Sequence, residues 1–228
     1  EECSVLVGRT SVTIEDVQDC LERAVARMHD ILGDRSGGAT VAGASVATHE
    51  GAPYWLVFNI GDSRVYRLST DGFAQVSVDH SVVQELLDSG RLSEDEAVTH
   101  ADRHVVTRAL ATDSSFEPDY WLIPVAPEDR LLVCSDGLTD ELDDAALHRI
   151  LSTEADPQAA AESLVEAALE EHTGLSIEFQ WVPDASRDEK INAALASDSL
   201  ADVVSLTSIN NTTVRQAMSQ GQFWEVEE

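Results

Sequence analysis

Basic residues are scarce in this chain of 228 residues, which has 14 Lys and Arg against 43 Asp and Glu and a formal net charge of −29 at pH 7. Lys190 is the only lysine. A surface this acidic repels phosphate backbones and anionic lipid headgroups, so binding to nucleic acid or to a membrane surface is not expected. The sequence also lacks any apolar run near the roughly 20 residues that span a bilayer, and it has no charged-then-apolar leader. These absences predict a cytoplasmic protein without membrane insertion.

Cysteines and aromatic residues are also few. Cys3, Cys20 and Cys134 are an odd number at wide spacing, which fits a reducing compartment better than a disulfide framework. Aromatic residues make up 5% of the chain and its four tryptophans are scattered, so no platform for stacked bases is indicated. The apolar fraction of 43% is nevertheless sufficient for a folded core.

The periodicity of the apolar residues predicts an α+β domain. Steps of three and four residues predict an amphipathic helix over 14–32, with Thr13 and Asp16 as a capping box. Further helices are expected at 81–89, from 93, at 143–152 and at 157–172. Apolar and β-branched runs predict strands at 39–48, 54–60, 65–68, 74–78, 120–125 and 130–134. Because helices do not alternate strictly with strands, we expect mostly antiparallel sheet, with a tight hairpin at 61–64.

Residue usage changes near Gly174. Asn59 is the only asparagine before residue 173, whereas three asparagines follow it. The segment 175–228 also has its own pattern of strand, helix, strand and helix. The change predicts a first domain over 1–173 and an unrelated or atypical C-terminal segment over 174–228.

Two aspartates stand just after predicted strands, and a third follows one of them. Asp62 follows the strand that ends at Ile60, Asp136 follows the strand at 130–134, and Asp140 comes four residues later. A helical turn between the last two would aim both carboxylates at one point. Carboxylates held at strand ends suit a hard cation such as Mg²⁺ or Mn²⁺. The structural alternative is that Asp62 is a turn residue and Asp140 a helix N-cap.

Four longer motifs, two of which contain these residues, follow one another in order. They are NIGDSRVY at 59–66, Asp79-His80-Ser81, VTRAL at 106–110 and LVCSDGLTD at 132–140. Together they resemble the metal-dependent serine/threonine protein phosphatases of type 2C, the PPM family, especially its bacterial branch. Several motifs in order are more specific than one. The resemblance covers about residues 10–172 and implies a β-sandwich of two antiparallel sheets with flanking helices.

The resemblance also implies an activity and a metal site. The activity is dephosphorylation of phosphoserine and phosphothreonine in proteins, with two or three Mn²⁺ or Mg²⁺ ions activating a water for attack on phosphorus. Asp136 matches the carboxylate shared by the metal centre, and Asp62 and Asp140 match residues that hold a further metal together with it. Gly61 and Gly137 lie beside these ligands. Residues 80–112 match a flap in which substrate contacts vary.

The sequence departs from the family pattern on both sides of these motifs. No predicted strand before Asp62 carries a Glu-Asp pair, no Asp-Gly-x-x-Gly motif precedes Asp62, and 175–178 stands where the family has an Asp-Asn pair. Of the binuclear ligands only Asp136 is visible, so we expect an internal phosphatase fragment joined to an unrelated one, with little or no turnover. The missing strands would expose sheet edges and favour dimers or aggregation. A phosphatase-like binding module without activity is the alternative function.

Other patterns lead to further expectations. Segments within 178–204 resemble the first lobe of bacterial extracellular solute-binding proteins, so a fragment of an ABC-importer binding protein is a second alternative. His100 and His104 have the spacing of zinc ligands on a helix, but the sequence offers no evident third ligand. His80 is expected to be structural, and Cys134 a buried, inert thiol.

Overall fold

The structure is a computed structural model that describes residues 2–112, 116–176, 189–190 and 193. The chain divides into two units, Glu1–Ile177 and Glu178–Glu228. In the second unit only residues 189–190 and 193 are described. The predicted elements of the tail, and the segments that resemble a solute-binding protein, otherwise lie outside the described residues.

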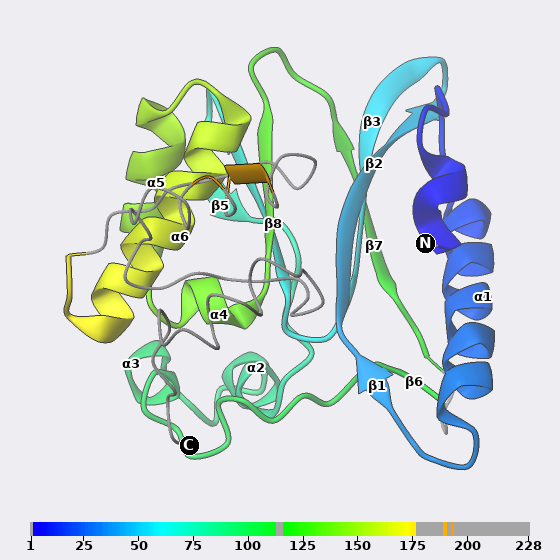
Figure 1. The fold of residues 1–228 in the computed structure, drawn as a ribbon, viewed down its shortest axis with the longest axis horizontal. Helices are drawn as coiled ribbons and strands as arrows, with labels where there is room; N and C mark the ends of the chain where they lie inside the picture. The colour runs from blue at the N-terminus through cyan, green and yellow to red at the C-terminus, as the bar shows by residue number, and fades with distance from the viewer. Residues whose placement is uncertain (1, 113–115, 177–188, 191–192, 194–228) are drawn as a thin grey trace. The chain divides into compact units, whose positions relative to one another are not determined.

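Two antiparallel sheets form the centre of the first unit (Figure 1). One has the strand order β2 (Val41–His49), β3 (Ala52–Ile60), β7 (Asp119–Pro124). The other has the order β5 (Gly72–Gln75), β4 (Arg64–Ser69), β8 (Arg130–Cys134). The sheets contact each other through β2 and β3 on one side and β4 and β8 on the other. The predicted α+β sandwich of two antiparallel sheets is therefore confirmed.

Helix α1 (Ile14–Leu32) covers the outer side of the β2-β3-β7 sheet (Figure 1). Its apolar residues lie on one face, and Val17 and Leu21 are buried in a core that includes Leu56 and Ile60 of β3. The predicted capping box is present: the Asp16 N–H donates to Thr13 Oγ1 at 3.2 Å, and the Thr13 N–H donates to Asp16 Oδ2 at 3.0 Å. A 3₁₀ helix, η1 (Glu2–Leu6), contacts α1.

Helices α5 (Asp144–Thr153) and α6 (Pro157–Thr173) cover the other sheet (Figure 1). Leu147 and Leu164 are buried there with Tyr66 of β4. Both helices begin where side-chain caps predict, because Asp143 accepts from the Ala146 N–H and Asp156 from the Ala159 N–H. Each sheet thus has its own helical layer and its own core.

The connection from β5 to β7 contains the flap. It includes α2 (Val82–Asp88), α3 (Glu94–Ala97) and β6 (Leu110–Ala111), which pairs with β1 (Gly38–Ala39). Between β8 and α5, helix α4 (Asp136–Thr139) lies at the end of the sandwich nearest the flap helices (Figure 1). Within the described ranges, no helix combines the length and hydropathy that a bilayer-spanning segment requires.

The predicted hairpin at 61–64 is wrong. Strand β3 pairs with β2 and β7, whereas β4 pairs with β5 and β8, so the turn carries the chain from one sheet to the other. Two apolar runs joined by a Gly-Asp turn have the same pattern in both arrangements. The difference matters for function, because this turn places Asp62 where the two sheets meet.

Candidate metal site

The turn that contains Asp62 is fixed by its neighbours. Gly61 has a φ of +106°, and a Cβ added there would lie 2.4 Å from Thr40 Cγ2. The Gly61 N–H donates to His80 Nδ1 at 3.1 Å, and the Gly61 carbonyl accepts from the His80 N–H at 2.9 Å. Asn59 Nδ2 donates to the same carbonyl at 3.0 Å. Only glycine fits this position, and the backbone before Asp62 is tightly held.

The carboxyl group of Asp62 lies in a negative environment. Burial raises the pKa of Asp62, and the charges of Asp136 and Asp79 raise this pKa further. The charge of Asp136, after β8, thus acts on the carboxyl group of Asp62, after β3, although Asp62 is not part of the group of ligand atoms that the described residues bring within 4.8 Å of one another. A divalent cation at this point would relieve the repulsion.

The acidic turn after β8 has the predicted geometry. Helix α4 begins at Asp136, and the Asp140 N–H donates to the Asp136 carbonyl at 2.8 Å, which closes one helical turn. The alternative of Asp140 as an N-cap is wrong, because Asp140 ends α4 and Asp143 is the N-cap of α5. Gly137 lies inside α4, where an added Cβ would make only ordinary contact with Ser135 Oγ at 3.7 Å.

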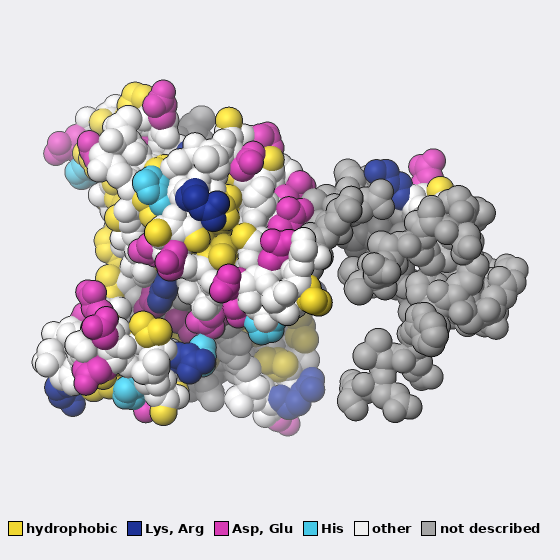
Figure 2. Space-filling view, turned by 90° about the vertical axis from the view of Figure 1, so that its left-hand side faces the viewer, with side chains coloured by type: hydrophobic (Ala, Val, Ile, Leu, Met, Phe, Trp, Pro, Cys, Tyr) yellow, Lys and Arg dark blue, Asp and Glu magenta, His cyan; other side chains and the backbone are white. Residues whose placement is uncertain are grey.

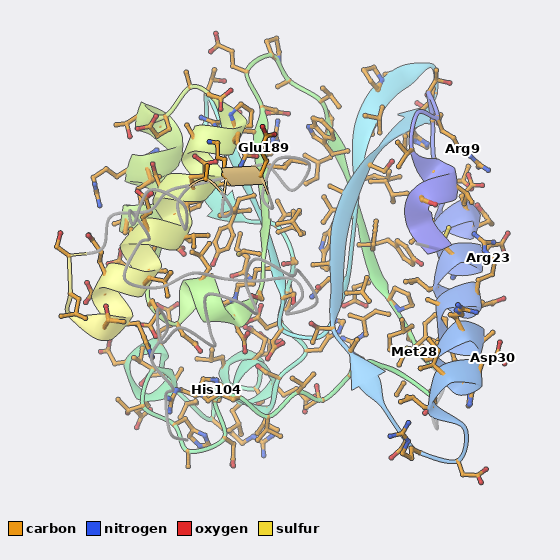
Figure 3. All side chains as sticks on the ribbon, viewed as in Figure 1. Arg9, Arg23, Met28, Asp30, His104 and Glu189 are labelled. Carbon is orange, nitrogen blue, oxygen red and sulfur yellow. The ribbon has the colours of Figure 1, made fainter. Side chains whose placement is uncertain are left out.

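A histidine from the flap joins this turn. Ligand atoms of His104, Asp136 and Asp140 all lie within 4.8 Å of one another. His104 Nδ1 is 3.7 Å from Asp140 Oδ2, and Figure 3 shows His104 among the flap helices α2 and α3. The sequence pattern pairs His104 with His100, whereas in the structure His104 converges with the acidic turn. No local signal could have found this group, because it forms only when the flap folds back onto α4.

The donor set fits a divalent cation. It contains carboxylate oxygens and one imidazole nitrogen, which Mn²⁺ accepts, while Mg²⁺ prefers the oxygens. Two arginines near the site are paired with other carboxylates: Arg64 Nη2 lies 2.6 Å from Asp79, and Arg108 Nη1 lies 3.0 Å from Asp119. The carboxylates of the acidic turn are half exposed, so waters can complete an octahedral shell.

Residues of the other motifs hold the turn that contains Asp62 through hydrogen bonds. His80 is buried, and because its Nδ1 accepts from Gly61, its Nε2 carries the proton and donates to Asp119 Oδ2 at 3.0 Å. Burial raises the pKa of Asp119, but hydrogen bonds from Arg108 and His80 outweigh burial and lower this pKa. The prediction of a structural His80 is confirmed. Three of the four motifs are thus joined by hydrogen bonds, because Gly61 bonds to His80 and both His80 and Arg108 bond to Asp119 of β7.

Cys134 contributes no reactive group to the site. It is half-buried at the end of β8, and burial raises the pKa of its thiol to about 11. A thiol with this pKa is protonated at neutral pH and is a poor nucleophile. The raised pKa favours the predicted inert thiol, although the side chain is less buried than expected.

Curated relatives of the chain are protein phosphatases. It is 31% identical to the serine/threonine phosphatase stp of Listeria innocua over 150 residues. The matched region is 62% of this chain and 58% of the relative. It is 31% identical over 110 residues to the protein phosphatase PhpP of Streptococcus pneumoniae, over 48% of this chain and 45% of the relative. The chain thus spans about half the length of these relatives. No family model matches it.

Solved structures give the same result. The PPM Ser-Thr phosphatase MsPP from Mycobacterium smegmatis is 37% identical with a TM-score of 0.58, over 72% of this chain and 69% of that one. The serine/threonine phosphatase PstP/Ppp of Mycobacterium tuberculosis is 28% identical with a TM-score of 0.66, over 75% and 72%. A PstP catalytic domain in complex with two manganese ions has a TM-score of 0.61 at 27% identity, over 72% and 68%. None of these relatives lends support to a solute-binding tail. The chain belongs to the PPM family of metal-dependent serine/threonine protein phosphatases.

Proposed function

We propose that this chain comes from a bacterial phosphatase that removes phosphate from phosphoserine and phosphothreonine in cytoplasmic proteins. The observation that supports this most is the convergence of Asp136 and Asp140, from the turn after β8, whose ligand atoms lie within 4.8 Å of each other and of His104, while the charge of Asp136 also acts on Asp62 of the turn after β3. The phosphatase relatives, one of them a catalytic domain with two manganese ions, supply the reaction class.

The residues of this chain have separate roles in the proposed site. Asp62, Asp136 and Asp140 would hold Mn²⁺ or Mg²⁺. When bound, these ions activate a water for attack on phosphorus and neutralise the phosphate oxygens. Gly61 and His80 fix the orientation of Asp62 through the hydrogen bonds of the turn. A bound cation is needed for a further reason, because a chain with a net charge of −29 otherwise repels a phosphorylated substrate.

We expect this chain of 228 residues to bind metal but to turn substrate over poorly. Its sequence has no Asp-Gly-x-x-Gly motif before Asp62 and no Asp-Asn pair at 175–178, so the family's binuclear ligands are represented by Asp136 alone. The same observation favours the second candidate function, a phosphatase-like module that binds a phosphoprotein partner without hydrolysing it.

Hydrolysis of p-nitrophenyl phosphate and of a phosphothreonine peptide, with and without Mn²⁺, tests the proposal. Mn²⁺ titration by isothermal calorimetry runs in parallel on the same chain and on Asp136→Ala. We expect Mn²⁺ binding that Asp136→Ala weakens, with little turnover. Fast Mn²⁺-stimulated turnover that Asp136→Ala abolishes would overturn the incomplete site. Absence of Mn²⁺ binding would overturn the metal site itself.

A further inference from the structure

We infer that His104 of the flap supplies a nitrogen ligand to the metal held by Asp136 and Asp140, so that the bound ion fastens the flap to the end of the sandwich. The inference rests on the proposed metal site and adds a ligand and a selectivity to it. A site with this imidazole prefers Mn²⁺ and other first-row transition ions over Mg²⁺.

The distances fit one shared ion. The ligand atoms of His104, Asp136 and Asp140 lie within 4.8 Å of one another. Two ligands on opposite sides of a divalent ion, at bonds of about 2.1 Å each, are separated by about 4.2 Å. The side chains of His104 and Asp140 are 47% and 45% exposed, so neither is held by packing. Small rotations of these exposed groups would bring all three donors to bonding distance.

The backbone beside His104 is anchored while its imidazole is not. The Val105 carbonyl accepts from the Val82 N–H at 2.9 Å, and the Val105 N–H donates to the Asp102 carbonyl at 3.0 Å. The contact of the imidazole itself is with Asp140, at 3.7 Å. The fold therefore delivers His104 to the acidic turn, where Asp140 is the partner that the described residues give its ring nitrogens.

An ordinary ion pair does not account for this arrangement equally well. A pair between two half-exposed side chains at 3.7 Å contributes little to stability. The pair also leaves Asp136 unexplained, although its carboxylate converges on the same point. One cation would engage all three groups, and imidazole nitrogen is a better ligand for transition ions than for Mg²⁺.

Metal titrations of the full chain test the inference. Mn²⁺ and Mg²⁺ are titrated by calorimetry into the unsubstituted protein, His104→Ala, the matched control His100→Ala, and Asp136→Asn. We expect His104→Ala to weaken Mn²⁺ binding by roughly 10- to 100-fold, the range known for loss of even an outer partner of a metal ligand. Mg²⁺ binding should change much less, and His100→Ala should leave both affinities unchanged.

Pulsed electron paramagnetic resonance of bound Mn²⁺ supplies a readout independent of affinity. A ¹⁴N modulation from directly bound imidazole should be present in the unsubstituted protein and absent in His104→Ala. Circular dichroism and Tm show whether each variant is folded. If Asp136→Asn abolishes Mn²⁺ binding while His104→Ala changes neither affinity nor modulation, the inference fails and the proposed metal site stands. An equal loss in His100→Ala would also overturn the inference. Failure of the unsubstituted protein to bind Mn²⁺ would overturn both.

Discussion

At the scale of single residues, Gly61 decides where Asp62 points. Its φ of +106° favours glycine, and a methyl group in place of its hydrogen would overlap Thr40. Its N–H and carbonyl are both bound to His80. The turn is therefore specified by one residue without a side chain and by one buried imidazole.

Gly61→Ala is accordingly expected to destabilise the fold by about 1–3 kcal/mol, because a non-glycine residue is forced into a strained backbone region. Urea unfolding followed by circular dichroism measures the change. Gly137→Ala is the matched control: an added Cβ has room there, and alanine is the better helix former, so stability should be unchanged or slightly higher. Equal stabilities for the two variants would contradict this account of the turn.

A second residue, Asp129, stabilises the fold because its side chain links the two sheets. Its side chain is 1% exposed and lies 2.8 Å from Arg67 of β4, while Trp55 Nε1 of β3 donates to it at 2.9 Å. Burial raises the pKa of Asp129, but hydrogen bonds from the Ala126 N–H, Trp55 and Arg67 outweigh burial and lower it. The charged form is thus the one that the folded state favours.

Asp129→Asn should therefore cost roughly 3–5 kcal/mol at neutral pH, since it breaks a buried pair and leaves Arg67 uncompensated. A folded pKa below the ordinary value means that this stabilisation is present above the ordinary pKa of Asp and is lost as pH falls through the folded pKa. Urea unfolding between pH 7 and pH 3 measures both effects. In Asp129→Asn the acid-induced loss of stability should be smaller. The exposed Asp71→Asn is the control and should behave like the unsubstituted protein.

At the scale of elements, periodicity and capping residues predicted most of the fold. Helix α1 runs over the predicted residues, and β8 matches its predicted bounds, because apolar spacing and side-chain caps act locally. The sequence does not predict which strands pair with each other. The turn at 61–64 looks like a hairpin, and only the pairing of β4 with β8 shows that it is not. The break at Thr40 that separates β1 from β2 and the strand β6 also escaped prediction, because two-residue strands carry no periodicity.

The candidate site divides in the same way. Asp136 and Asp140 were predictable as a pair because one helical turn relates them, and Asp62 was identified through its motif. His104 was not predictable, because its place beside Asp140 depends on how the flap folds across α4. The i, i+4 spacing with His100 was misleading: His100 Nδ1 instead accepts from the Asp102 N–H at 3.1 Å. Local chemistry can be read from sequence, whereas convergence of distant segments cannot.

At the scale of the whole molecule, charge and exposed strands act against each other. Acidic side chains are spread over the face shown in Figure 2, and the formal net charge is −29. Among the strands that the structure describes, β7 and β8 lie at the edges of their sheets, and they carry Leu122 and Val133 with exposed fractions of 44% and 46%. Unpaired strand edges with apolar side chains favour association, while like charge on every copy opposes it.

Self-association of the chain should therefore increase with salt. The Debye length falls from about 30 Å at 0.01 M to about 10 Å at 0.1 M ionic strength, so added NaCl screens the repulsion between copies but not the attraction between apolar edges. Sedimentation velocity over this range should show a rising dimer fraction. Val133→Lys places a charge on the edge of β8 and should keep the protein monomeric at higher salt, whereas the same change at the exposed Val98 of the flap should not. A dimer fraction that falls with salt would mean that copies associate through charge, and then the edge strands are not the cause.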